Sequence, residues 1–193
     1  MKLKIKNFKK AFTLIEMMVA LGVIAVLSTM VLAYTRSSQV FSNLIRETER
    51  LIFELRRAQN LSMLVFQETA GSQDICGWGI YLNRDQLPQT SYILFSDNCL
   101  PGSSVGNQRY DSGEEKETIN LLKGIEIFKS NVYSVVFVPP EPRIKFFPSL
   151  GINENAYFKI RLQNQPERDC YKISISAAGQ ISKEVISVVS DCQ

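Results

Sequence analysis

A single carboxylate stands at the start of a long, uncharged, apolar stretch near the beginning of this 193-residue chain. After Glu16, no charged residue occurs until Arg36. An acid at the centre of a bilayer costs about 2.5–3.5 kcal/mol on insertion scales, and such residues are usually functional. A buried carboxylate is tolerated when a cation pairs with it. The chemistry open to Glu16 is therefore a specific ion pair, which an ordinary membrane anchor does not need.

A basic segment precedes this stretch. The first ten residues contain five lysines and no acid, which predicts that the N-terminus stays in the cytoplasm while the rest is exported. The apolar block is longer than the core of an ordinary secretory signal and close to the roughly 20 residues of a spanning helix. A cleaved secretory signal and a plain uncleaved anchor are the alternatives, but neither has a use for Glu16.

Few other residues have types and spacings that suggest chemistry. The chain has no histidine, the commonest general base, and no Gly-x-Ser-x-Gly, phosphate-loop or paired-carboxylate motif. We therefore expect no enzymatic activity and no cofactor. A membrane-tethered enzyme is an alternative without a nameable catalytic residue. Asp111, Glu114 and Glu115 could bind Ca²⁺, but their spacing matches no EF-hand, so we interpret them as a solvated acidic loop.

The four cysteines, Cys76, Cys99, Cys170 and Cys192, all lie in the part predicted to be exported. An even number in such a compartment predicts disulfides, with three possible connectivities. We favour Cys76–Cys99 and Cys170–Cys192, because each pair joins sequence neighbours expected on adjacent strands. Free buried thiols are the alternative. A zinc site is disfavoured, since the paired Cys-x-x-Cys spacing and histidine are both absent.

The N-terminal third of the chain predicts a long helix. Residues 12–35 form the apolar block, and residues 36–66 carry apolar side chains at helical spacing, among them Leu44, Leu51, Leu55 and Ala58. No proline interrupts the span from Phe12 to Phe66. We expect one helix whose first half spans a membrane or packs against other copies. Its second half has an apolar stripe suited to a sheet.

Residues 67–193 predict a β-rich domain. Short β-branched and aromatic runs alternate with turn residues, and predict strands at 77–82, 91–96, 118–122, 125–128, 133–138, 143–147, 157–163, 171–176 and 180–186. In the clearest run, Phe158, Ile160 and Leu162 should face a core. Residues 97–116 read as a long surface loop, and Trp78 as a core or turn anchor. The fold class is α+β, a helix on a small antiparallel sheet domain.

The segment from Lys9 to Glu16 resembles the class III signal peptide of the type IV pilin and pseudopilin superfamily, a basic leader and a small residue before Phe-Thr-Leu-Ile-Glu. The resemblance implies that residues 1–11 are a leader, cut between Ala11 and Phe12 by a prepilin peptidase that then N-methylates Phe12. It implies that Glu16 pairs with the terminal amine of a neighbouring subunit. Ala11 departs from the glycine that the family usually has. The implied fold is a pilin-like lollipop.

Three further segments are similar to the pseudopilin H and FimT-like minor-pilin group, namely 55–63, 77–81 and 171–181. This likeness implies a structural subunit of a type II secretion pseudopilus or a type IV pilus. Its partners would be prepilin peptidase and other pilin subunits. Its location would be the inner membrane, with a periplasmic or extracellular C-terminal domain and a filament after assembly.

Capture of DNA for uptake, as in FimT-like minor pilins, is the alternative function. Six basic residues are candidates to line one face that binds nucleic acid: Arg143, Lys145, Lys159, Arg161, Arg168 and Lys172. However, FimT-like DNA binders resemble one another in an arginine-bearing C-terminal turn, and the matching residues 179–183 contain no arginine. Removal of the leader takes five lysines from a formal net charge of +3 and leaves −2, which does not predict a nucleic-acid partner.

Overall fold

The computed structural model describes residues 13–68, 75–100, 103, 106–139, 143–151, 154–163, 165, 170–187 and 192. Within the helix, the side chains of 32–38 and 65–68 lie outside this description. The chain divides into two compact units, Met1–Ser42 and Asn43–Gln193. Each unit is described by itself.

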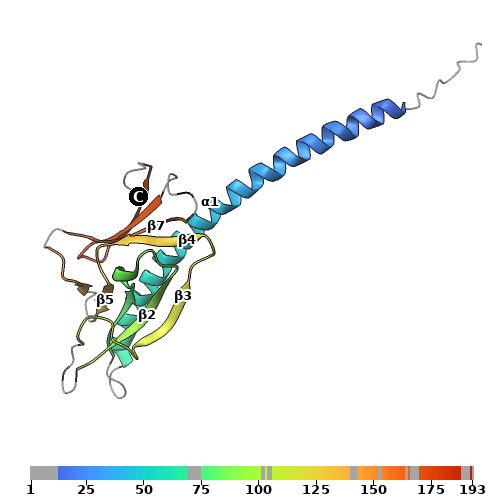
Figure 1. The fold of residues 1–193 in the computed structure, drawn as a ribbon. Coiled ribbons are helices and arrows are strands. Elements are labelled where there is room, and N and C mark those ends of the chain that lie inside the picture. Colours follow the sequence, from blue (N-terminus) through green and yellow to red (C-terminus); the bar gives the residue numbers. More distant parts are fainter. Residues whose placement is uncertain are drawn as a thin grey trace, which may run out of the picture. The chain divides into compact units, whose positions relative to one another are not determined.

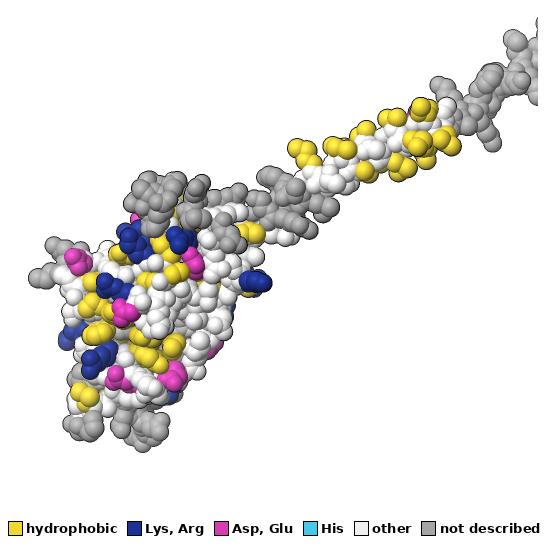
Figure 2. Space-filling view, viewed as in Figure 1, with side chains coloured by type: hydrophobic (Ala, Val, Ile, Leu, Met, Phe, Trp, Pro, Cys, Tyr) yellow, Lys and Arg dark blue, Asp and Glu magenta, His cyan; other side chains and the backbone are white. Residues whose placement is uncertain are grey.

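Helix α1 (Leu14–Glu68) begins in the first unit and ends in the second. In the first unit, every described side chain from Thr13 to Val31 is exposed. The window Leu14–Val31 has a mean hydropathy of 2.3 and no buried part, and Figure 2 shows hydrophobic side chains around it. Among the described residues, this is the one helix long and apolar enough to cross a membrane.

The second part of α1 packs into the globular unit. The apolar stripe predicted from the sequence is buried, with Leu44, Leu51, Leu55 and Ala58 at most 1% exposed. Ion pairs one turn apart support the helix, with Arg57 Nη1 3.1 Å from a carboxylate oxygen of Glu54, which is itself buried. In Figure 1, this part of the helix lies against the strands of the unit.

In the described part of the chain, nine strands form two antiparallel sheets, and all nine strands predicted from the sequence occur. The first sheet has the order β3-β2-β1-β5-β6 and is built from β1 (Ile75–Tyr81), β2 (Ser91–Asn98), β3 (Glu115–Asn120), β5 (Ser134–Val138) and β6 (Arg143–Phe147). The second has the order β4-β7-β8-β9 and is built from β4 (Ile125–Ser130), β7 (Ala156–Leu162), β8 (Cys170–Ile175) and β9 (Ile181–Ile186). A short 3₁₀-helix, η1 (Arg84–Gln86), lies between β1 and β2. The α+β fold class is confirmed.

One hydrophobic core joins the helix to the inner faces of both sheets. Its largest side chains include Phe137 from the first sheet and Phe158 from the second. The alternation predicted for β7 is confirmed, since Phe158, Ile160 and Leu162 are buried and belong to this core. Trp78 packs against the core from β1, as expected of an anchor.

The outer face of the first sheet carries a second packed layer, which the sequence did not predict. Phe95 is fully buried there, and Tyr110 meets its ring edge-on at 5.5 Å while stacking on Tyr81 at 4.3 Å. Gly79 makes this possible, because a Cβ on it would lie 2.5 Å from the Val135 carbonyl oxygen and 2.8 Å from the Phe95 ring. The predicted loop 97–116 is also shorter than expected, since β2 continues to Asn98 by pairing with β1, and β3 begins at Glu115.

Candidate functional site

The beginning of α1 is the first candidate site. The Glu16 backbone N–H donates a hydrogen bond to Thr13 Oγ1 at 3.3 Å, and the Met17 N–H donates to the Thr13 carbonyl oxygen at 3.3 Å. Thr13 therefore caps the helix, and Glu16 occupies the third helical position, which matches the Ser/Thr-x-x-Glu capping box. Sequence reasoning missed this role, although the spacing of Thr13 and Glu16 was the signal for it.

The electrostatics of this end favour a negative charge. A carboxylate in the first turn interacts favourably with the positive end of the helix dipole. Glu16 is exposed and is surrounded along the chain by apolar side chains, among them Leu14 at 79% and Ile15 at 70% exposure. Ala11 and Phe12 lie outside the described residues, so the cleavage and methylation assigned to them stay predictions. The arrangement presents one anion at the start of an apolar helix.

The exposed apolar surface of the first unit requires a partner other than water. Soluble proteins rarely expose contiguous apolar patches beyond a few hundred Å². An 18-residue apolar helix with no buried part is of the length that a bilayer accommodates. This surface fits a lipid environment or contact with other apolar helices.

The cysteines form the two pairs favoured from the sequence. Cys76 and Cys99 are joined with their Cα atoms 5.0 Å apart, and Cys170 and Cys192 with theirs 5.8 Å apart. No cysteine is free, so the structure does not contain the alternative thiols. Among the described residues, no group of three metal-binding side chains occurs.

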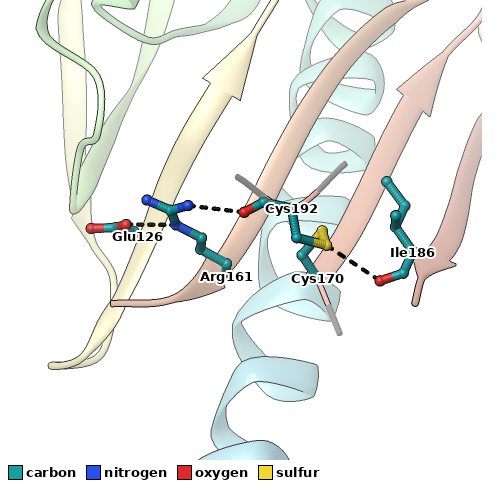
Figure 3. Close-up of a disulfide and its surroundings, with 5 residues drawn as sticks. All are labelled: Glu126, Arg161, Cys170, Ile186 and Cys192. Atoms are coloured by element: carbon teal, nitrogen blue, oxygen red, sulfur yellow. Dashed lines mark hydrogen bonds and ion pairs between the residues drawn. A yellow bond between two sulfur atoms is a disulfide. The ribbon is translucent and has the colours of Figure 1, made fainter. Parts of the chain in front are cut away.

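The second disulfide is reinforced by Arg161 (Figure 3). The Arg161 guanidinium donates to a carboxylate oxygen of Glu126 at 2.9 Å and to the Cys192 carbonyl oxygen at 2.9 Å. It also lies 4.4 Å from the centre of the Phe128 ring. Glu126 and Cys192 are both nearly buried. Arg161 thus links β4, β7 and residue 192.

The acidic loop is only partly solvated, which corrects the interpretation from sequence. Glu114 is 5% exposed and accepts hydrogen bonds from the Asn98 and Asp111 backbone N–H groups, each at 2.9 Å. Asp111 and Glu115 are exposed as expected. The Glu114 carboxylate is buried because it satisfies backbone donors at the end of β2, a tertiary role that residue spacing does not reveal.

The described members of the six basic residues proposed for nucleic acid are divided between the two sheets. Arg143 and Lys145 lie on β6 in the first sheet, whereas Lys159, Arg161 and Lys172 lie on β7 and β8 in the second. Arg168 lies outside the described residues. Figure 2 shows acidic side chains among the basic ones on the visible face of the globular unit.

Comparison with known proteins locates one match. Residues 6–32 match the family model described as the prokaryotic N-terminal methylation motif. No curated protein and no solved structure matches the chain. The match covers the predicted cleavage site, the helix cap and the apolar part of α1. It implies processing by prepilin peptidase and assembly with other pilins. Together with the apolar helix, it fits a single-pass inner-membrane protein. The chain thus carries the N-terminal methylation motif of type IV pilin-like proteins, on an α+β fold of the pilin-like kind.

Proposed function

We propose that this protein is a minor pilin or pseudopilin that is assembled into the filament of a type II secretion system or a type IV pilus. Prepilin peptidase cuts it between Ala11 and Phe12 and methylates Phe12. The observation that carries the proposal is Glu16, an exposed acid at the start of an apolar helix, inside the residues that match the methylation motif. The lysines before Ala11 keep the N-terminus cytoplasmic.

The mechanism follows from two separable properties of the first helical turn. Thr13 already caps the backbone, since its hydroxyl oxygen accepts a hydrogen bond from the Glu16 N–H within the same chain. The negative charge of Glu16 is then available to a cation brought by a second chain. After cleavage, the new α-amine at Phe12 is such a cation, because α-amines have a pKa of about 8 and are charged at neutral pH. In lipid this pairing offsets the cost of the carboxylate and places the incoming subunit in register.

The two disulfides support export of the globular unit. Disulfides form and persist in oxidising compartments and are rare in the cytoplasm. Both bridges lie in the second unit, which follows the apolar window Leu14–Val31 in the sequence. A periplasmic or extracellular position for residues 67–193 is part of the proposal.

The processing step is tested by intact mass and the N-terminal peptide of the full chain, expressed with and without a prepilin peptidase. We expect N-methyl-Phe12 as the terminus only when the peptidase is present. An intact Met1 terminus in the presence of the peptidase, or cleavage after the apolar block near Ala33, would contradict the proposal.

A pair of variants separates the charge of Glu16 from its capping role. Glu16→Gln keeps a capping-box residue, because Gln serves at this position as Glu does, but removes the charge. Thr13→Ala keeps the charge and loses the cap, at about 1 kcal/mol. We expect filament yield to fall at least tenfold in the first variant and less than threefold in the second, with both chains cut at Phe12. Wild-type assembly of Glu16→Gln would refute the ion-pair mechanism.

Within the superfamily, we assign the chain to the pseudopilin H and FimT-like group on its three similar segments. DNA uptake is the alternative function of this group. It is tested by a salt-dependent mobility shift of a DNA fragment with the full chain in detergent, since phosphate contacts weaken linearly in log salt. The diversion of Arg161 to Glu126 and Cys192 weakens that alternative.

A further inference from the structure

A cavity of about 240 Å³ lies on the outer face of the first sheet. Its floor is a row of side chains across three strands, because the register places Tyr81 on β1 opposite Ile93 on β2, and Ile93 opposite Thr118 on β3. Residues that pair across neighbouring strands point to the same face of a sheet. Three hydrogen-bonded strands therefore hold the floor in place.

The segment between β1 and β2 forms a wall of this cavity with three side-chain amides, those of Asn83, Gln86 and Gln89. The Asp85 backbone N–H donates a hydrogen bond to Asn83 Oδ1 at 3.3 Å, which fixes the start of η1. Gln89 exchanges two backbone hydrogen bonds with Ile127 on β4, at 2.9 and 2.8 Å. The backbone of the wall is thus anchored at both ends.

Tyr110 adds a second aromatic ring to the lining. It stacks on Tyr81 with the ring centres 4.3 Å apart, and its hydroxyl donates a hydrogen bond to the Glu115 carboxylate at 3.2 Å. Both tyrosines are half-buried, so part of each side chain remains accessible. Tyrosine offers a large, rigid contact surface at a low cost in conformational entropy. The cavity therefore has a preformed aromatic side.

Several polar side chains of the cavity are available to a ligand. Within the part of the chain that the structure describes, the side chains of Gln86, Gln89, Ser91 and Thr118 form no hydrogen bond. A side-chain amide has both donors and an acceptor, and a hydroxyl can donate and accept. The lining thus presents donors and acceptors side by side, as a ligand with several hydroxyl groups requires.

The cavity is uncharged. None of the described residues that line it is Asp, Glu, Lys or Arg. Acids lie close to it, since Glu115 accepts from the Tyr110 hydroxyl, and the charge of Asp85 adds to burial in raising the pKa of Tyr81. The adjacent Arg84 donates to a backbone carbonyl oxygen at 3.1 Å. A phosphate or sulfate would find no cation in the lining, whereas a neutral ligand needs none.

We propose that this cavity binds one ring of a neutral oligosaccharide. The C–H groups of a sugar ring pack on aromatic and apolar side chains, here Tyr81, Tyr110 and Ile93, while its hydroxyls bond to the amides of Gln86 and Gln89. Ligand pockets usually measure about 300–1,000 Å³. A cavity of about 240 Å³ therefore takes a single ring and leaves the rest of the oligosaccharide outside. The inference goes beyond the proposed function and does not depend on processing at Phe12.

A sugar titration of the purified full chain tests the proposal, in a detergent without a sugar headgroup. The probes are maltotriose, cellotriose and triacetylchitotriose, each raised to about 10 mM and followed by isothermal titration calorimetry. We expect at least one of them to bind at one site per chain. Its affinity should change less than twofold between about 0.1 and 1 M salt, because no ion pair takes part.

Matched variants locate the site. Gln86→Ala combined with Gln89→Ala should weaken binding at least tenfold. Asn98→Ala combined with Gln163→Ala removes two exposed amides outside the cavity and should change the affinity less than twofold. Thr118→Trp fills the cavity from an exposed position and should abolish binding. An unchanged circular dichroism spectrum confirms that each variant is folded.

Three results would overturn the inference. The first is a lack of binding by all three sugars, and the second is wild-type affinity in the folded variant that lacks both cavity amides. The third is tighter binding of heparin or of a 20-nucleotide single strand, lost at high salt and in Thr118→Trp, which would assign the cavity to a polyanion. The proposed function is decided separately, by the terminus at Phe12.

Discussion

Asp97 is a buried acid whose protonation should make the stability of the globular unit depend on pH. It lies on the outer face of β2, fully buried, and accepts a hydrogen bond from the Gln108 N–H at 3.1 Å. Its carboxylate contacts Gly106 so closely that no side chain would fit there. Burial raises the pKa of Asp97 to about 6, against an ordinary value of 3.8, and the nearby charges of Glu114 and Asp111 add to this. Hydrogen bonds from Gln108 and Asn107 oppose it.

The sign and size of the effect follow by linkage. Because the folded state holds the proton more tightly than the unfolded chain, this contribution is fully present below pH 3.8 and is lost as pH rises through about 6. The full difference amounts to about 3 kcal/mol, since each pH unit between the two pKa values is worth about 1.4 kcal/mol. Between pH 4.5 and 8, the wild-type chain should lose about 2 kcal/mol through Asp97 alone.

The perturbation is Asp97→Asn, which keeps an acceptor for Gln108 but cannot ionise. Urea unfolding of the full chain in detergent, followed by the fluorescence of Trp78, the one tryptophan of the chain, reports on the neighbouring strand β1. The free energy of unfolding of the variant minus that of wild type should rise by about 2 kcal/mol from pH 4.5 to 8. The other carboxylates contribute equally to the pH dependence of wild type and variant, so their contributions cancel in this difference. Glu184→Gln controls for the loss of one charge. A difference that does not change with pH would refute the reasoning.

Three further substitutions test the packing of the globular unit by the same urea titration. Arg161→Ala should lower the free energy of unfolding by about 3 kcal/mol, because it leaves the buried Glu126 carboxylate without its partner. Adding Glu126→Gln to the same chain should restore part of this loss. Gly79→Ala should lower the free energy of unfolding by about 2 kcal/mol, since the new Cβ would clash with both the Val135 carbonyl oxygen and the Phe95 ring. Replacing Cys76 and Cys99 by Ser should cost about 3 kcal/mol by releasing a loop of 23 residues in the unfolded chain. An effect below about 1 kcal/mol in any of the three would contradict the corresponding contact.

The strands were predictable because their signal is local. In β7, apolar and polar side chains alternate, and the buried residues Phe158, Ile160 and Leu162 are those that the alternation placed inside. The same holds for the stripe on α1 that buries Leu44 and Leu55. In both cases, one face of a single element packs against the core. A repeat of two residues in the strand, or of about 3.6 residues in the helix, is therefore enough to predict which side chains are buried.

The second layer over the first sheet was not predictable, because its causes lie in different strands. The sequence shows glycines on both sides of Trp78, but the reason for Gly79 is the Phe95 ring from β2 and the Val135 carbonyl from β5. The burial of Glu114 likewise depends on the Asn98 N–H at the end of β2. A loop rich in polar residues therefore looked solvated, although tertiary hydrogen bonds hold part of it inside.

The apolar window Leu14–Val31 has no packing partner within the single chain, and this indicates its role. Residues Leu14–Val31 bury nothing within the chain, so the stability of the globular unit cannot explain their composition. In lipid, apolar helices gain nothing from hydrophobicity when they associate, because lipid tails are as apolar as leucine. If the proposed function holds, this helix leaves lipid and packs against the helices of other subunits, so it needs a contact that is more favourable in the filament than in the bilayer. Under the proposed function, the charge of Glu16 supplies this contact, since a carboxylate is unfavourable in lipid alone and favourable when a cation pairs with it. The charge, rather than the cap that Thr13 supplies, is the property on which assembly should depend.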